Sequence, residues 1–303
     1  MQIPQNRPIR ILGAACGRGA PDPRCALGPE ALRAAGVVER LSLGDRAVAW
    51  DETLECADPA LTPLEAVAEL CPRLAEKTSS AIGSGEFPLV LSGDHSCAVG
   101  IWSGVSRALQ PQGDLGLLWI DAHLDSHTPA TSHTGMIHGM PLAALLGYGE
   151  ASLTECGAPG PKLLARNVCI VGVRSFEAEE KRFLSELGVR IFYMEEIRRR
   201  GFAAVLQDAL ELVQAHTAGF GISFDLDVID PLEAPGVGTP APKGVGADAL
   251  RKALEGLGGH PLLAAFELSE YNPARDIDGR SARVAIELLA DLFAVGKPLE
   301  AAP

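Results

Sequence analysis

The sequence predicts an α/β protein in which a parallel sheet is covered by helices on both faces. Two observations lead to this prediction. Short apolar segments alternate with amphipathic segments along the whole chain, and most of the apolar segments are uninterrupted by polar residues. Strands buried on both faces of a parallel sheet need such continuous runs, and helices connect them. We interpret residues 1–303 as a single domain, because no stretch resembles a flexible linker.

The predicted elements follow from these patterns in chain order. The β-branched and apolar runs expected to be strands are residues 9–13, 88–91, 115–121, 168–173, 189–193, 220–227 and 262–268. Apolar residues recur at helical spacing in the predicted helices, which are residues 29–35, 64–82, 202–216 and 280–295. Pro72 is expected to kink or divide the second of these helices, because proline has no N–H group to donate.

The composition is that of an acidic globular protein. Lys and Arg number 26 against 39 Asp and Glu, a net charge of −13, whereas nucleic-acid binding needs clustered cations. No stretch is apolar over the roughly 18 residues of a membrane span, and the N-terminus lacks the apolar core of a signal peptide. The seven cysteines form no CxxC pair. We therefore expect a cytoplasmic protein with reduced thiols and no nucleic-acid or membrane partner.

Polar residues after one predicted strand have the pattern of a metal site. Residues 121–125 read D-A-H-L-D after an apolar run, and an extended backbone sends residues i, i+2 and i+4 to one side. We therefore expect Asp121, His123 and Asp125 to converge at the edge of the sheet. Carboxylates this close repel one another without a cation. The alternative, a strand end with solvated acids, is disfavoured by the uniformly apolar residues before it.

Two further segments complete a candidate ligand set. Asp225 and Asp227 end an apolar run in S-F-D-L-D, and His95 follows another strand in S-G-D-H-S, where a structural role is equally consistent. The three segments offer four carboxylates and two imidazoles without a thiolate, which suits two divalent ions such as Mn²⁺. Two metals ~3.5–4 Å apart hold a shared water as hydroxide near neutral pH. The sequence therefore predicts metal-assisted hydrolysis.

Five motifs in this order resemble those of the ureohydrolases, the family of arginase, agmatinase and formimidoylglutamase. They are S-G-D-H-S, D-A-H-L-D-S-H-T-P, T-G-M-I-H-G-M-P-L, S-F-D-L-D-V-I-D-P and E-Y-N-P. L-G-P-E-A-L-R at residues 27–33 and G-V-G-T-P at residues 236–240 extend the resemblance to nearly the whole chain. The loop H-T-P-A-T-S-H-T-G-M-I-H-G is most similar to that of the arginases.

The resemblance implies a three-layer α/β/α sandwich around a mainly parallel, roughly eight-stranded sheet. It also implies two Mn²⁺ ions per chain and a homo-oligomer, either a trimer or a hexamer. The metal ligands it implies are His95 and Asp125 for one ion, His123 and Asp227 for the other, and Asp121 and Asp225 as bridges.

The resemblance further implies three catalytic roles. A hydroxide that bridges the ions attacks the guanidinium or formimino carbon to give a tetrahedral intermediate, and Asp125 passes a proton to the departing amine. His138 matches the family's proton-shuttle histidine, a role that suits an imidazole near pH 7. Glu270 matches the glutamate that pairs with the guanidinium in a planar, charge-assisted contact. The alternatives are a structural His138 and a Glu270 that is only an exposed strand-end acid.

The chain departs from the arginase pattern at the positions that bind the α-carboxylate and α-amino group of arginine, the end of the substrate away from the guanidinium. The loop positions that hold the α-carboxylate of arginine as Asn, Ser and Asn carry His127, Thr134 and Met136. Met136 cannot donate a hydrogen bond, and His127 changes size and charge. Glu177 is a candidate for the acid that faces the α-amino group. These four residues are candidate substrate contacts, although exposed loop positions are the alternative for His127 and His133.

The first hypothesis is therefore hydrolysis of the guanidino C–N bond of arginine to give ornithine and urea. Guanidinobutyrate, agmatine or formimidoylglutamate are alternative substrates. Two alternatives of another class are a non-catalytic arginase-fold binding protein and a one-zinc deacetylase. The complete set of six ligand positions disfavours both, because degenerate relatives lose ligands first and a one-zinc site needs only one D-x-H group.

Overall fold

A sheet of eight parallel strands forms the centre of the computed structural model, which describes residues 6–55 and 58–295. The strands are β1 (Ile9–Ala15), β2 (Val48–Glu55), β3 (Phe87–Ser92), β4 (Leu115–Ile120), β5 (Val168–Val173), β6 (Arg190–Tyr193), β7 (Gly219–Asp225) and β8 (Leu263–Ser269). Their order across the sheet is β2-β1-β3-β8-β7-β4-β5-β6, and every pairing between them is parallel. Their carboxyl ends therefore meet at one edge, with β3, β8, β7 and β4 adjacent in the middle.

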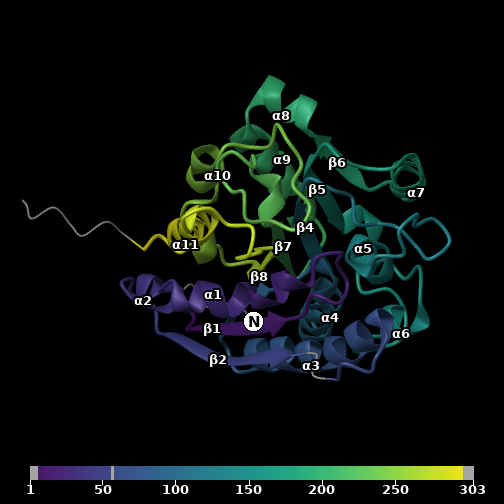
Figure 1. Cartoon of the computed structure of the whole chain (residues 1–303), viewed down its shortest axis with the longest axis horizontal. Helices are drawn as coiled ribbons and strands as arrows, with labels where there is room; N and C mark the ends of the chain where they lie inside the picture. The colour runs from purple at the N-terminus through teal and green to yellow at the C-terminus, as the bar shows by residue number, and fades with distance from the viewer. Residues whose placement is uncertain (1–5, 56–57, 296–303) are drawn as a thin grey trace, which may run out of the picture.

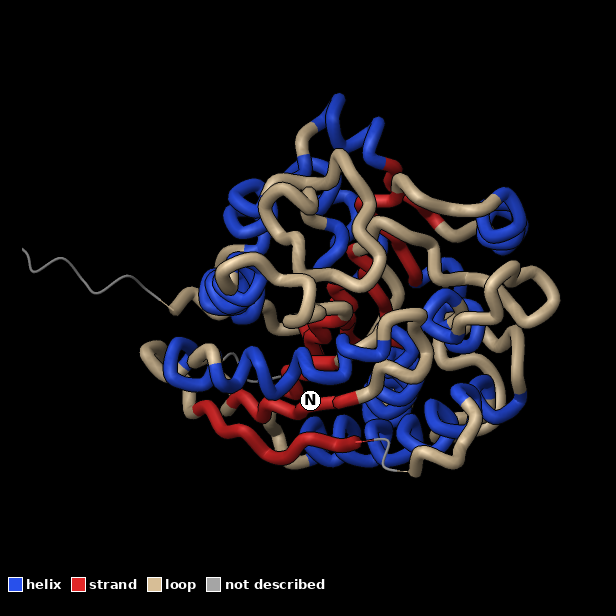
Figure 2. The backbone as a smooth tube through the Cα atoms, in the orientation of Figure 1, coloured by secondary structure: helices blue, strands red, loops and turns tan. Residues whose placement is uncertain are grey.

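Helices cover both faces of this sheet (Figures 1 and 2). One face carries α1 (Gly28–Ala34), α2 (Val37–Leu41), α8 (Met194–Arg200), α9 (Phe202–Gln214), α10 (Ala247–Leu254) and α11 (Arg280–Leu292). The other carries α3 (Pro63–Gly83), α4 (Ala98–Leu109), α5 (Pro141–Leu145), α6 (Ala151–Thr154) and α7 (Ala178–Leu187). The predicted three-layer sandwich is confirmed.

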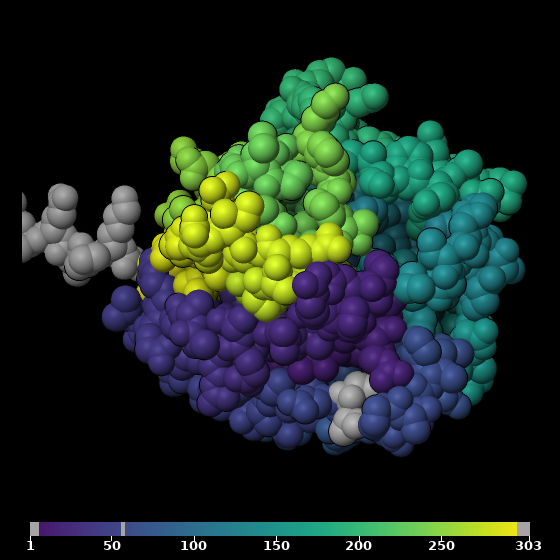
Figure 3. Space-filling model, viewed as in Figure 1, coloured from purple at the N-terminus to yellow at the C-terminus, as the bar shows by residue number. Residues whose placement is uncertain are grey.

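The two ends of the described chain lie side by side on one of these faces. The purple N-terminal helices border the yellow α11 in the space-filling view (Figure 3). Arg40 of α2 donates to Glu287 of α11 through Nε at 2.8 Å and through Nη2 at 3.0 Å. This paired contact joins α2, near the start of the chain, to α11, the last helix of the described residues.

Successive side chains of each central strand enter opposite layers of the core. In β4, Leu118 and Ile120 pack into the layer of α9, whereas Leu117 and Trp119 pack into the layer of α4. All four are fully buried. A strand covered on both faces has no polar side, which is why the parallel strands read as continuous apolar runs.

The sequence does not predict β2. This strand lies at one edge of the sheet and pairs only with β1. Its residues alternate between exposed and half-buried over most of their length, and Asp51 and Glu52 lie in its middle. An edge strand exposed on one side needs no continuous apolar run, and its charges discourage pairing with another chain.

The four predicted helices are present, with ends within three residues of the expected positions. The expected division at Pro72 does not occur, since α3 runs unbroken for 21 residues with this proline inside it. Leu70, Cys71 and Leu74 are buried on either side of Pro72 against the core. Their burial offsets the hydrogen bond that the proline removes.

Two other sequence predictions concern cysteines and membranes. The six described cysteines are buried and unpaired, whereas Cys56 lies outside the described residues. Within the described ranges, none of the helices combines the length and the apolar character that a membrane span requires.

Candidate active site

One local turn shapes the chain after β3, β4 and β7. Asp94, Asp121 and Asp225 each accept a hydrogen bond from the backbone N–H two residues further on, at 2.9, 2.7 and 2.8 Å. Aspartate stabilises such turns because its short carboxylate reaches this N–H group. The expectation of an extended backbone through residues 121–125 is therefore wrong, because β4 ends at Ile120. The side chains converge through turns instead.

The first group of converging side chains surrounds His95. Its Nδ1 atom lies 3.3 Å from Asp121 Oδ2, 3.0 Å from Asp125 Oδ2 and 3.1 Å from Asp225 Oδ2. The ring is fully buried, and Nδ1 has no hydrogen-bond partner of suitable geometry. A buried nitrogen that faces three carboxylate oxygens without a hydrogen bond fits the donor set of a bound cation.

A second group surrounds His123. Its Nδ1 atom lies 3.0 Å from Asp227 Oδ2 and 3.5 Å from Asp121 Oδ1. Asp121 thus faces one histidine with each of its oxygens. It belongs both to the group of His95, Asp125 and Asp225 and to the group of His123 and Asp227, and within each group the ligand atoms lie within 4.8 Å of one another. The six predicted ligands therefore lie together at the carboxyl edge of the sheet. Asp225 belongs to the His95 cluster only, so its bridging role stays a prediction.

The charges of these residues also fit a metal centre. Burial raises the pKa of Asp125 to about 6, and the Asp121 carboxylate adds to the shift. Burial and the neighbouring Asp227 and Asp121 raise the pKa of Asp225 well above its usual value. Burial opposes a charged His95 ring, yet the carboxylates around it outweigh this effect and raise its pKa. Divalent cations remove this conflict between buried like charges.

Two side chains of the site project from backbone in the left-handed region. Asp125 has φ +47° and Glu270 has φ +65°, values that residues other than glycine seldom adopt. Backbone hydrogen bonds hold both turns, from Leu142 N to Asp125 O at 2.9 Å and from Glu270 N to Gly93 O at 2.7 Å. Such strain persists only where the surrounding structure enforces it, and it is concentrated at functional sites.

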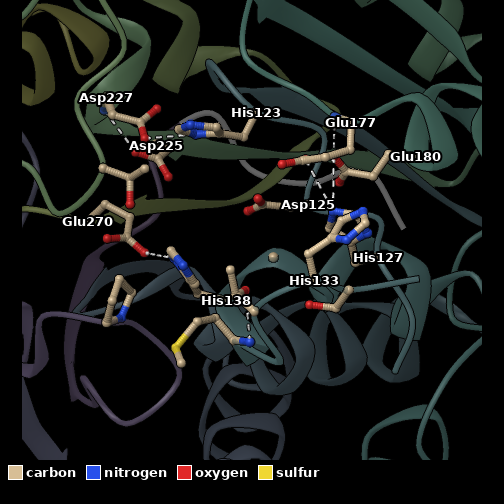
Figure 4. A pocket seen from close by; sticks show the side chains of 16 residues that line it. His123, Asp125, His127, His133, His138, Glu177, Glu180, Asp225, Asp227 and Glu270 are labelled. Carbon is tan, nitrogen blue, oxygen red and sulfur yellow. Dashed lines mark hydrogen bonds and ion pairs between the residues drawn. The ribbon is translucent and has the colours of Figure 1, made fainter. Parts of the chain in front are cut away.

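His138 and Glu270 contact each other in the wall of the pocket (Figure 4). His138 Nδ1 lies 3.1 Å from Glu270 Oε1, which also accepts the backbone N–H of His95 at 2.9 Å. Burial disfavours the charged His138 ring, but Glu270 outweighs it and raises the pKa of His138 to about 9. Glu270 is only 2% exposed, and its Oε2 atom has no hydrogen-bond partner. The second oxygen is therefore an unused acceptor in the pocket wall.

These groups line a pocket of about 340 Å³. Six further lining residues form what we call the loop end of the pocket: His127, His133, Thr134, Met136, Glu177 and Glu180. Of these, His127, His133, Glu177 and Glu180 lie on the side away from Asp225 and Asp227 (Figure 4). All four predicted substrate contacts are among the six. Within the described chain, no lysine or arginine lines this pocket.

A histidine and two glutamates form the polar centre of the loop end. His127 Nε2 lies 3.2 Å from Glu177 Oε2 and 3.5 Å from Glu180 Oε2. Sequence reasoning did not find Glu180. This side chain is 4% exposed and accepts the backbone N–H groups of Ser126 at 3.0 Å and Glu177 at 3.2 Å. Its spacing of three residues from Glu177, at the start of a helix, was the available signal. His133 is mostly exposed.

Four residues behind the metal cluster were also not predicted. Trp119 stacks on His95 with ring centroids 4.2 Å apart, and its Nε1 atom donates to Asp121 Oδ2 at 2.8 Å. Ser223, Glu267 and Trp102 form a hydrogen-bonded chain that ends on His95 Nε2. Ser223 begins the S-F-D-L-D motif but was given no role there, and the other three lie within largely apolar segments of β4, α4 and β8 that offer no motif.

Comparison with known proteins identifies the relatives of this chain. Residues 7–294 match the model of the Arginase family. An arginase from Bacillus caldovelox is 40% identical over 296 residues, which cover 95% of this chain and 98% of that protein. The crystal structure of arginase from Bacillus cereus superimposes with a TM-score of 0.88 at 37% identity, covering 97% of this chain and all of the other. A formiminoglutamase from Trypanosoma cruzi, at 23% identity and a TM-score of 0.76, shares the fold.

Proposed function

The chain belongs to the arginase family of ureohydrolase enzymes, and from this premise we propose that it hydrolyses arginine to ornithine and urea. The reaction adds water across the guanidino group: a C–O bond forms, the C–N bond to the side-chain nitrogen breaks, and that nitrogen leaves as an amine. The site must therefore hold a cationic guanidinium, direct water to its carbon and return a proton to the departing nitrogen.

We propose that two divalent ions, Mn²⁺ in the simplest case, are the cofactors. His95 and Asp125 would hold one ion, His123 and Asp227 the other, and Asp121 and Asp225 would bridge both. The buried His95 Nδ1 without a hydrogen bond, beside three carboxylates, supports this assignment. When bound, two such ions activate water and stabilise negative charge as it develops.

Glu270 is the proposed partner of the guanidinium. Its Oε1 atom is fixed by His95 N and His138 Nδ1, which leaves Oε2 free to accept a substrate N–H group. Because the carboxylate is almost fully buried, a charge-assisted contact there is stronger than one in water. The fixed position of Oε1 orients the plane of this contact.

Asp125 and His138 are the proposed groups that carry protons. Asp125 lies among the converging carboxylates, where it can accept a proton and pass it to the departing amine. His138 lies between Glu270 and the pocket, with 16% of its side chain exposed. This position suits a shuttle that exchanges protons between the pocket and solvent.

The carboxylates of the loop end favour a substrate that carries an ammonium group, as arginine does. Glu177 and Glu180 face the pocket together, and among the described residues no lysine or arginine lines it. The α-ammonium group of arginine would meet these carboxylates, while the Thr134 hydroxyl and the His127 ring offer hydrogen bonds to its α-carboxylate. The ammonium group of agmatine could meet the same carboxylates, so only contacts to the α-carboxylate would separate arginine from agmatine. Guanidinobutyrate or formimidoylglutamate brings carboxylates toward the two acids without an ammonium group.

One observation keeps a second guanidino substrate in consideration. Met136 cannot donate a hydrogen bond, and the His127 ring is already paired with Glu177 and with Thr131, whose Oγ1 lies 3.2 Å from Nδ1. Fewer free donors then remain for an α-carboxylate than two amide side chains would offer. This weakens selection against a substrate that lacks the group.

Family membership also supports proposals about the assembly, the location and the partners of the protein. We propose a cytoplasmic homo-oligomer, a trimer or a hexamer, which acts on a small molecule and has no nucleic-acid or membrane partner. Sedimentation equilibrium measures the assembled mass directly, and a monomeric mass at micromolar concentration would remove the oligomer from the proposal.

A substrate screen of the Mn²⁺-loaded protein tests the proposed activity. Arginine, agmatine, guanidinobutyrate, guanidinopropionate and formimidoylglutamate are compared by release of urea, or of formamide for the last. We expect arginine to have the highest kcat/KM. A higher value for another guanidino compound corrects the substrate, and turnover of none of the five overturns the proposed function. Metal analysis of the same sample separates a two-metal hydrolase from a one-zinc enzyme.

A further inference from the structure

We propose that Glu267, acting through the Ser223 hydroxyl, fixes the imidazole of His95 in the orientation and tautomer that present Nδ1 to the metal centre. The inference rests on the proposed metal binding and deepens it. Glu267 and Ser223 are positioning residues, because Ser223 touches His95, Glu267 touches Ser223, and neither of them lines the pocket. The three side chains, which we call the His95 relay, come from β8, β7 and the turn after β3.

The sheet itself assembles the His95 relay. Ser223 of β7 and Glu267 of β8 lie opposite each other in the parallel register. Ser223 Oγ lies 2.8 Å from Glu267 Oε2 on one side and 2.9 Å from His95 Nε2 on the other. All three side chains are fully buried. No solvent reaches the relay, so its hydrogen bonds must be satisfied within it.

The donors around Glu267 determine the direction of the hydrogen bonds. Trp102 Nε1, which can only donate, lies 2.9 Å from Glu267 Oε2, and Ser92 Oγ donates to Oε1 at 3.0 Å. With Ser223, three donors converge on one carboxylate, which therefore acts as an acceptor at both oxygens. The Ser223 proton points toward Glu267, and its lone pair faces His95 Nε2.

The direction passes through Ser223 to His95. A hydroxyl oxygen that donates to Glu267 accepts from His95, so Nε2 carries the ring proton and Nδ1 carries the lone pair. Nδ1 is the atom that faces Asp121, Asp125 and Asp225 at 3.0 to 3.3 Å. A histidine ligates a metal through an unprotonated nitrogen, and a hydrogen bond at the other nitrogen decides which one that is.

The cost of burial supports this assignment. A carboxylate that is fully buried loses its hydration, which is costly unless it makes several hydrogen bonds. In the proposed reaction Glu267 touches neither the substrate nor the proposed ligand atoms, since it contacts only Ser92, Trp102 and Ser223 among the described side chains. Trp119 holds the ring plane by stacking, but stacking does not distinguish Nδ1 from Nε2. That distinction needs the hydrogen bond that His95 Nε2 donates to Ser223 Oγ.

Three substitutions separate hydrogen-bond direction from charge. Ser223→Ala removes the acceptor from His95 Nε2. Glu267→Met removes the acceptor from Ser223 at similar side-chain length. Glu267→Gln removes the charge but keeps the direction, because its amide oxygen can still face Trp102 and Ser223. Its NH₂ group then points to Ser92, whose hydroxyl can turn to Leu268 O at 3.4 Å. Ser103→Ala is the matched control, a buried hydroxyl of α4 outside the relay.

The measurement is titration of metal-free protein with Mn²⁺, by calorimetry and by electron paramagnetic resonance. We expect two equivalents to bind in the wild type, in Glu267→Gln and in Ser103→Ala. In Ser223→Ala and Glu267→Met we expect one equivalent to weaken by about 10- to 100-fold, as for other partners that orient a ligand. The spectrum of a coupled ion pair should then give way to that of a single ion.

Thermal unfolding in chelator provides the structural control. A lower Tm for Ser223→Ala and Glu267→Met with both Mn²⁺ equivalents bound as tightly as in the wild type would show a merely structural role and overturn the inference. Equal weakening in Glu267→Gln would assign the effect to charge and would overturn it as well. A wild type that binds no Mn²⁺ removes the proposed function first, so the two failures are distinguishable.

Discussion

At the scale of single residues, the site depends on two aspartates whose carboxylates each have two roles. Asp121 and Asp225 each use one oxygen to hold a backbone turn, and each has an oxygen within 3.3 Å of His95 Nδ1. The turn thus fixes the carboxylate before any cation binds. Preorganised ligands spare a metal site the entropy of ordering its side chains, which favours binding.

His123→Asn tests the ligand assignment at this scale. The amide cannot replace the imidazole nitrogen that faces Asp227 and Asp121, so we expect one Mn²⁺ equivalent to be lost. Activity should fall by about 100-fold or more, the effect of losing a group that stabilises transition-state charge. Metal content, kcat and circular dichroism measure this. His133→Asn, at an exposed histidine of the same pocket, is the control, and unchanged turnover in His123→Asn contradicts the assignment.

Glu177→Gln tests substrate selection at the loop end. Loss of a charge-assisted hydrogen bond worth ~1.5–3 kcal/mol should lower kcat/KM for arginine by about 10- to 100-fold. Turnover of guanidinobutyrate, which lacks an ammonium group, should not fall. Glu179→Gln is the matched control. Glu179 follows Glu177 by two residues, and its carboxylate lies 3.9 Å from the exposed His133. Equal losses for both substrates would contradict recognition of the ammonium group by Glu177.

At the scale of secondary structure, close contact between β7 and α4 sets the position of the His95 relay. Gly221 in β7 lies against the ring of Trp102 in α4, whose Nε1 atom donates to Glu267. A side chain at this strand position would push the indole away from the sheet. The absence of a side chain at residue 221 therefore connects helix packing to the residues behind the metal cluster.

Gly221→Ala tests this connection. A Cβ atom there would lie 2.0 Å from Cζ3 of Trp102, so we expect overpacking to cost ~1–3 kcal/mol of unfolding free energy. Gly83→Ala, where no atom lies within 4 Å of the added carbon at the end of α3, should stabilise by ~0.5–1 kcal/mol. Urea unfolding measures both. A Gly221→Ala protein as stable as the wild type would show that the indole can move freely.

At the scale of the whole molecule, the buried acids couple metal binding to stability. Four aspartates at the centre of the sheet edge are at most 7% exposed. Among the described residues, only His95 and His123 form ion pairs with their carboxylates. The metal-free protein must therefore retain protons on these groups or tolerate their repulsion.

Metal removal should accordingly lower the thermal stability of the whole protein. We expect EDTA to reduce Tm, and Mn²⁺ at 100 times its dissociation constant to restore ~2.7 kcal/mol for each site. Mg²⁺ should restore less, because imidazole ligands suit Mn²⁺ better. Differential scanning calorimetry measures the shift. Identical curves with and without chelator would contradict a metal site in the native fold.

The sequence by itself determined the fold class and the candidate ligands. Continuous apolar runs occur because central strands are covered on both faces, and the D-x-H and D-x-D spacings are local, so both appear in a linear reading. The half-exposed β2 was missed because its burial is only partial. The extended geometry expected for residues 121–125 was wrong because the aspartates form turns.

Only the tertiary structure decided which polar residues act together across the sheet. No sequence pattern connects Ser223 with Glu267 or with His95, yet Ser223 meets them from positions 44 and 128 residues away. These contacts depend on strand order, register and helix packing, which place β8 beside β7 and β3. The physical reason is that a hydrogen bond depends on distance in space, and chain separation does not limit it once the apolar layers fix the sheet.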